Sequence, residues 1–252
     1  MATKYRVNPK SFFSQLTQRI CSTEFAADAR HALFAKAFTR SRKLPLPSLI
    51  AALLSMRGAS QQVMLDSFFG SLGDDSDFHR GITDRGFAKA RDRLSCNPLQ
   101  RLNAFVVQTA DRLGLVERWQ GLRVVAADAS VFFPAVRACA NLKGFAASPN
   151  QKLFSLFLPG AELTLYAQVH GVHTAERQML FEALAQLGPD DVLVLDRGYP
   201  ATWLVAYLNG HKIRFCMRCD KVNGCKAMRA LLSSSNTETT VTLKKAQFTR
   251  RH

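Results

Sequence analysis

Acidic residues are scarce in this 252-residue chain. Asp and Glu number 19 against 34 Lys and Arg, which gives a formal net charge of +15 and a pI near 10.0. The excess is not confined to a basic tail, because residues 1–120 carry +8 and residues 121–252 carry +7. A chain this basic usually binds a polyanion, most often nucleic acid. Charge alone does not name the partner, since a generally basic soluble protein has the same composition.

Long hydrophobic segments are absent as well. The N-terminal MATKYRVNPK is polar and lacks the apolar region of a signal peptide. The longest apolar stretch, Leu44 to Met56, is short and contains proline, so it does not suit a membrane span. Six cysteines at irregular spacing do not suggest a disulfide framework. These absences predict a reduced, cytoplasmic protein with no membrane partner.

Several catalytic motifs are also missing. The sequence contains no G-x-S-x-G, H-E-x-x-H or phosphate-loop motif, which argues against hydrolases, zincins and NTPases of those types. Cys216, Cys219 and Cys225, with His211 nearby, could form a zinc site. Their spacing is poor for four ligands, and a free cysteine in a strand is an ordinary small apolar residue.

Apolar residues at helical spacing predict that residues 1–115 are mostly helical. SFFSQLTQRICSTEF and ADARHALFAKAFTR both show this spacing. Further helices are expected at residues 48–56, 84–94 and 98–113.

The pattern changes after Gly121. Strands are expected at residues 122–128, 152–158, 163–170, 192–196 and 212–219, and helices at residues 175–187, capped by Thr174, and 202–209. Three strands followed by alternating helices and strands predict a mixed sheet with helices on its faces.

Two of these strands end in an aspartate. VVAAD ends at Asp128, and VLVLD ends at Asp196. If the strands are neighbours, the two carboxylates meet at the carboxyl edge of the sheet, where open sheets bind ligands. A divalent cation resolves their repulsion, and two such ions could clamp a phosphodiester. The alternative is that each aspartate only starts a turn or caps a helix.

Basic residues recur on the predicted helix at residues 84–94. Arg85, Lys89 and Arg93 are four residues apart, so they could contact the phosphates of DNA. The alternative is a solvated helix face, partly neutralised by Asp84 and Asp92.

The ordered set of segments from about Lys43 to Arg218 resembles a DDE transposase of the insertion-sequence-four family. The matching segments, in chain order, are RKLPLPSLIAALLSMRGASQQVMLDSFFG, GFAKARDRLS, VVAADAS, HTAERQMLFEAL, VLVLDRGYPATWLVAYL and FCMRC. The resemblance implies an α/β chain with a helical N-terminal DNA-binding region at residues 1–118. An incomplete RNase H-like mixed sheet with flanking helices would follow at residues 119–252.

The resemblance also implies function. Asp128 and Asp196 would be the first two acids of the catalytic triad and would bind Mg²⁺ or Mn²⁺. Arg197 and Tyr199 belong to the second-aspartate motif and are expected to contact DNA. The expected partners are double-stranded transposon ends and a second copy of the chain or a full-length transposase.

One part of the family pattern is missing. The third acid of the family is a glutamate in a Tyr, Arg, Glu, Lys motif on a later helix, and no residue after Asp196 reproduces this motif. The only glutamate there is Glu238, in the polar stretch SSSNTETTVTL. We therefore expect a transposase truncated before its third acid. The alternative is a non-catalytic DNA-binding remnant or inhibitor, and a further option is a nuclease that uses two acids and His170.

Overall fold

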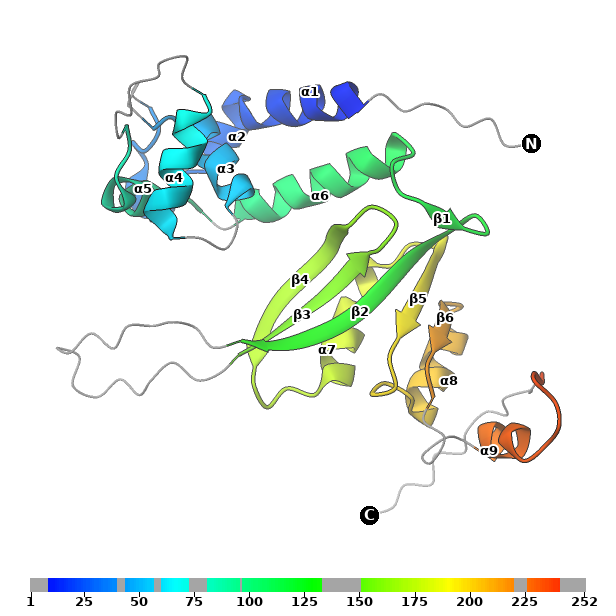
Figure 1. Cartoon of the computed structure of the whole chain (residues 1–252). Helices are drawn as coiled ribbons and strands as arrows, with labels where there is room; N and C mark the ends of the chain where they lie inside the picture. The colour runs from blue at the N-terminus through cyan, green and yellow to red at the C-terminus, as the bar shows by residue number, and fades with distance from the viewer. Residues whose placement is uncertain are drawn as a thin grey trace, which may run out of the picture. The chain divides into compact units, whose positions relative to one another are not determined.

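Helices make up the first part of the chain and a β-sheet the second (Figure 1). The computed structural model describes residues 9–39, 44–56, 60–72, 81–95, 97–132, 151–219 and 226–240. The chain divides into two units, Met1–Leu113 and Gly114–His252. The naming of the first unit as a DNA-binding region stays a prediction.

The helices of the first unit pack around a small apolar core. They are α1 (Pro9–Ile20), α2 (Thr23–Asp28), a 3₁₀ turn (Ala32–Phe34), α3 (Leu46–Ser55), α4 (Gln61–Gly70), α5 (Asp84–Arg91) and α6 (Asn97–Arg112). Phe25, Leu49 and Phe87 are buried at the centre of the core. Ser22, Ser60 and Thr83 each cap a helix by accepting a hydrogen bond from a backbone N–H of its first turn.

Two helix predictions in this unit are wrong in extent. ADARHALFAKAFTR is not one helix, because α2 ends at Asp28 and Arg30 instead forms an isolated antiparallel bridge with Leu94. The backbone of His31 donates to the carbonyl of Arg93 at 2.9 Å, and Ser95 donates to the carbonyl of Ala29 at 2.9 Å. This pairing takes both segments out of helical geometry, so α5 also ends early, at Arg91.

The second unit contains a six-stranded mixed sheet. Its strands are β1 (Arg118–Trp119), β2 (Leu122–Phe132), β3 (Gln151–Leu158), β4 (Leu163–Gly171), β5 (Asp191–Leu195) and β6 (Arg214–Met217). The order is β4-β3-β2-β5-β6, and β1 pairs with β2. The pairs β2–β3 and β3–β4 are antiparallel, whereas β2–β5 and β5–β6 are parallel. The prediction of a mixed sheet is confirmed.

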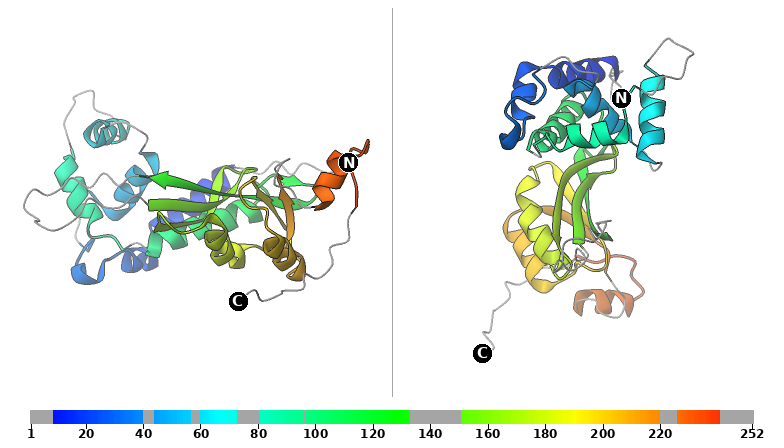
Figure 2. Two further views of the ribbon diagram at one scale, coloured as in Figure 1. Left: turned by 90° about the horizontal axis from the view of Figure 1, so that it is seen from below. Right: turned by 90° about the vertical axis from the view of Figure 1, so that its left-hand side faces the viewer.

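Helices α7 (Glu176–Ala183) and α8 (Thr202–Gly210) lie on one face of this sheet (Figure 2). Side chains alternate in burial along the strands, as a half-covered sheet requires. Phe154, Leu156 and Leu193 are fully buried, whereas Leu153 and Val194 are exposed. A further helix, α9 (Lys226–Leu232), follows later in the chain.

Three details of this unit differ from the sequence predictions. Thr174 does not cap α7, whose N-cap is Ala175 without a side-chain hydrogen bond, and α7 ends at Ala183 before a 3₁₀ turn (Leu184–Gln186). Strand β2 continues to Phe132, so Asp128 lies within the strand and not at its end.

Among the described residues, no helix is long and apolar enough to cross a membrane.

Candidate active site

The strands that carry Asp128 and Asp196 are neighbours in the sheet. In the parallel β2–β5 pair, Arg123 is level with Asp191 and Ala126 is level with Val194, a constant offset of 68 positions. Asp128 and Asp196 are separated by the same offset, so the register continued by two residues brings them level. Neighbouring strands lie about 4.8 Å apart. The sequence-based condition for a two-aspartate site is therefore met.

Both aspartates are exposed. The Asp196 Oδ1 atom accepts a hydrogen bond from the backbone N–H of Gly198 at 2.8 Å, which holds the carboxylate in the turn after β5. Among the residues that the structure describes, no cation pairs with either carboxylate. Two neighbouring carboxylates, one within β2 and one directly after β5, that pair with no cation among the described residues form a negative site that suits an oxygen-bound divalent cation.

The turn after β5 is held from the neighbouring helix. The guanidinium of Arg177, in the first turn of α7, donates to the carbonyl oxygens of Gly198 at 2.8 Å, Tyr199 at 3.0 Å and Pro200 at 3.3 Å. A Cβ atom added at Gly198 would lie 3.1 Å from Asp196 Oδ1 and 3.7 Å from Glu176 Oε2. Glycine therefore lets the turn pass close to both carboxylates.

Tyr199 is the buried residue of this turn, with 1% of its surface exposed. Its hydroxyl has no hydrogen-bond partner among the described residues. Burial raises the pKa of this hydroxyl, and the negative charges of Glu176, Asp128 and Asp196 raise it further. The contact of Tyr199 with DNA stays a prediction, and in this structure the side chain is shielded from solvent. Arg197, which precedes it in the turn, is exposed.

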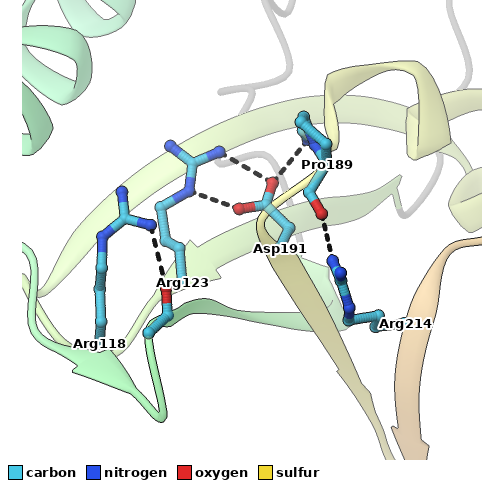
Figure 3. A network of polar contacts seen from close by, with 7 residues as sticks. Arg118, Arg123, Pro189, Asp191 and Arg214 are labelled. Atoms are coloured by element: carbon cyan, nitrogen blue, oxygen red, sulfur yellow. Dashed lines mark hydrogen bonds and ion pairs between the residues drawn. The ribbon is translucent and has the colours of Figure 1, made fainter.

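The other end of the β2–β5 pair carries a structural ion pair (Figure 3). Arg123 donates to both oxygens of Asp191, with Nε to Oδ1 at 2.6 Å and Nη2 to Oδ2 at 2.8 Å. The Gly188 N–H also donates to Asp191 Oδ2, at 2.7 Å. The side chains of Asp191 and Arg123 are 3% and 14% exposed. Arg214 donates to the carbonyl of Pro189 nearby. No sequence pattern predicted this ion pair.

No group of three Asp, Glu, His or Cys side chains in the described ranges is close enough together to form a complete metal site. The two aspartates still fit Mg²⁺ or Mn²⁺, since such ions often use one or two protein carboxylates together with water and phosphate oxygens. His170 is not part of this arrangement. It is level with Lys152 on β3, whereas Asp128 is level with Ser155, three residues away and so on the opposite face of the sheet.

The basic residues of α5 are arranged differently from the prediction. Arg85 and Lys89 are exposed on the helix, but Arg93 lies beyond its end and is partly buried. The Arg93 guanidinium lies over the ring of Phe34, 6.0 Å from the ring centroid. Lys89 and Arg93 line an open hollow of the first unit together with Lys36. The three residues therefore do not form one regular helical stripe.

The possible zinc ligands are only partly described. Cys216 is exposed on β6 and Cys219 is half-buried just after it, whereas Cys225 lies outside the described residues. The ring of His211 stacks on Tyr207, and its Nδ1 atom is 2.9 Å from the Tyr207 carbonyl oxygen.

No protein-family model matches the chain, and no curated protein matches it. The chain is similar to one solved structure, the crystal structure of the Mos1 mariner paired end complex with Mn. The two are 13% identical, with a TM-score of 0.28 over 84% of this chain and 69% of that chain. A TM-score of this size does not establish a shared fold.

Proposed function

We propose that this chain is a DNA-cleaving and strand-transferring enzyme of the DDE transposase type. The observation that carries the proposal is the placement of Asp128 on β2 and Asp196 directly after the neighbouring parallel strand β5. The register of the pair, continued by two residues, brings them level, and both are exposed and not paired with a cation among the described residues. The resemblance to the insertion-sequence-four family supports it, as does the net charge of +15, which suits a polyanionic substrate.

In this proposal Asp128 and Asp196 hold Mg²⁺ or Mn²⁺. When bound, the metal activates a water or a DNA 3′-hydroxyl for attack on a phosphodiester. The Gly198 N–H orients the Asp196 carboxylate, and Arg177 fixes the turn that contains this donor. The exposed guanidinium of Arg197 contacts a phosphate beside the site. Arg85 and Lys89 on α5 contact the DNA backbone elsewhere, without reading its sequence.

The test is nicking of end-sequence DNA by the full chain in Mn²⁺. We expect nicking that EDTA abolishes and that Asp196→Asn lowers by about 100-fold or more, because the substitution removes one of the two metal-binding carboxylates. Asp190→Asn is the matched control, since Asp190 is exposed at the opposite end of β5. Equal nicking by the wild type and Asp196→Asn would contradict the proposed role of Asp196.

The second candidate is a DNA-binding protein without catalysis, which pairs with a full-length transposase and inhibits it. It is favoured by the position of Glu238, which is exposed beyond α9 and belongs to no group of three metal-binding side chains in the described ranges. Electrophoretic mobility shifts at increasing salt separate the two candidates. A remnant binds end DNA with the salt dependence of phosphate contacts but does not nick it, and Asp196→Asn leaves its affinity unchanged.

A further inference from the structure

Strand β6 brings a cation into the row of residues that contains the two aspartates. In the parallel β5–β6 pair, Leu195 is level with Met217. Continued by one residue, this register makes Arg218 level with Asp196. The backbone supports the continuation, because the Arg218 N–H donates to the Leu195 carbonyl at 3.0 Å. Since Asp196 is in turn level with Asp128, the row runs from β2 through the end of β5 to the end of β6.

The Arg218 side chain lies on the face of the sheet opposite α7 and α8 (Figure 2). Burial alternates along β6 and just beyond it, so that every second residue is exposed, namely Arg214, Cys216 and Arg218. The residues between them are partly buried. Because successive side chains of a strand point to opposite faces, the exposed set shares the open face. Residues that are level on neighbouring strands point to the same face, so Asp128 lies on it too.

The charges of this row are distributed unevenly. On the other side of Asp128, the level residue of β3 is Ser155, and the residue of β4 level with Ser155 is Ala167. Neither of these carries a charge. Within the described part of the row, the two carboxylates are therefore followed by a positive charge on the β6 side and by neutral side chains on the β3 side.

The Arg218 guanidinium is available to an anionic ligand. It is exposed, and in the described ranges it forms no ion pair with a carboxylate, although Asp196 is only one strand away, about 4.8 Å. A guanidinium can bind a phosphate through two parallel hydrogen bonds. Beside two carboxylates, which repel a phosphate, it also supplies an attraction that favours the bound anion.

We propose that Arg218 binds a phosphate of the DNA strand at the site of Asp128 and Asp196, so that this strand lies on the β6 side of the site. The proposal rests on the proposed function for the roles of the two aspartates. The guanidinium contacts non-bridging oxygens of the phosphate and leaves the carboxylates to the divalent cation. It therefore contributes most to DNA affinity when the cation is bound, since only then is a phosphate held beside the two acids.

The experiment measures the affinity of the full chain for a short DNA duplex by fluorescence anisotropy, in Mn²⁺ and in EDTA at matched ionic strength. The ratio of the two affinities isolates the cation-dependent contacts, because phosphate contacts made elsewhere on the chain contribute to both. We expect Arg218→Gln to lower this ratio about tenfold, since a charged hydrogen bond to the phosphate is lost. Arg218→Lys should lower it less, because lysine keeps the charge but not the planar fork.

Two variants serve as matched controls. Arg214→Gln removes the same charge from the same face of β6, about 13 Å along the strand from Arg218, and should leave the ratio unchanged. Ser155→Ala alters the row on the β3 side and should also leave it unchanged. A fall with Arg214→Gln as large as that with Arg218→Gln would assign the effect to general charge and overturn the proposal. An equal fall with Ser155→Ala would overturn the placement of the strand on the β6 side.

Titration calorimetry with Mn²⁺ alone separates phosphate binding from a role in positioning Asp196. Arg218→Gln removes a positive charge near the cation, so its Mn²⁺ affinity should equal or exceed that of the wild type. Weaker Mn²⁺ binding would mean that Arg218 positions Asp196, and it would overturn the proposal.

The outcomes also separate this proposal from the proposed function. If Asp196→Asn loses the Mn²⁺-dependent increase in DNA affinity and Arg218→Gln keeps it, the role of Arg218 is wrong and the two-aspartate site stands. If Mn²⁺ does not raise the DNA affinity of the wild type, both proposals are overturned. Thermal unfolding in EDTA, followed by tryptophan fluorescence, checks folding of the second unit. If Arg218→Gln is unfolded, Arg218→Lys decides, and a ratio equal to that of the wild type would overturn the role.

Discussion

At the amino end of the β2–β5 pair, Asp191 is 4% exposed and binds both Arg123 and the Gly188 N–H. At the carboxyl end, Asp196 is exposed, and its only described hydrogen bond comes from Gly198, two residues away in its own turn. The same residue type therefore has two environments, one at the first residue of β5 and one in the turn directly after it. A buried carboxylate with its own arginine stabilises the fold, whereas an exposed carboxylate level with another carboxylate is available for a ligand.

The largest effect is expected at the amino end. Asp191→Asn removes the charge that compensates Arg123 in a largely buried environment, which should lower the free energy of unfolding by about 3–5 kcal/mol. Urea unfolding followed by tryptophan fluorescence measures this, because both tryptophans lie in the second unit. The exposed neighbour Asp190→Asn should change the free energy by less than about 0.5 kcal/mol. Equal losses in the two variants would show that burial does not distinguish these aspartates.

An intermediate effect is expected from the arginines that anchor the loops at the two ends of β5. Arg177→Gln should lower the free energy of unfolding by about 1–3 kcal/mol, because three carbonyl groups lose a charged donor. It should also weaken Mn²⁺ binding, since the Asp196 turn is no longer held against α7. Arg214→Gln removes one exposed bond to the Pro189 carbonyl. It should cost less stability and leave the Mn²⁺ affinity unchanged; weaker Mn²⁺ binding in both variants would mean that the effect is not local.

The smallest change in stability is expected at the carboxyl end. In EDTA, Asp128→Asn and Asp196→Asn should each change the free energy of unfolding by less than about 0.5 kcal/mol, and toward higher stability, because each relieves repulsion between nearby carboxylates. With Mn²⁺ added, only the wild type should gain stability. The same fluorescence measurement reports both results. A loss of more than about 1 kcal/mol in EDTA would assign these residues to the fold and not to a ligand.

The sequence predicted the sheet well because its strands carry strong local patterns. The apolar run from Val192 to Leu195 and the mostly apolar stretch at residues 152–158 are both short segments of the kind that forms buried strands. The parallel pairing of β2 with β5 was only a condition in the sequence argument, since periodicity does not reveal which strands are neighbours. The ion pair and the two aspartates have the same separation in sequence, and this equality could have indicated that β2 and β5 are neighbours. The pair Arg123 and Asp191 has the same 68-residue separation as Asp128 and Asp196.

The errors arose where long-range contacts override local preference. ADARHALFAKAFTR has helical spacing, but Arg30 pairs with Leu94, far along the chain, and the helix ends before it. Thr174 is a good capping residue by type, yet the cap position falls one residue later, at Ala175. The first turn of α7 is joined to the Asp196 turn by hydrogen bonds from Arg177, a long-range contact that no local signal encodes.

The buried ion pair also determines the alignment of the two exposed aspartates. Because the side chains of a strand alternate between its faces, a slip of one residue between β2 and β5 would move Asp196 by about 3.3 Å and turn it to the other side of the sheet. The same slip would separate Arg123 from Asp191. A misaligned sheet therefore loses this ion pair, which lies about 17 Å along the strands from the aspartates whose alignment matters chemically. The ion pair at the amino end of β5 thus maintains the alignment of the two aspartates at its carboxyl end.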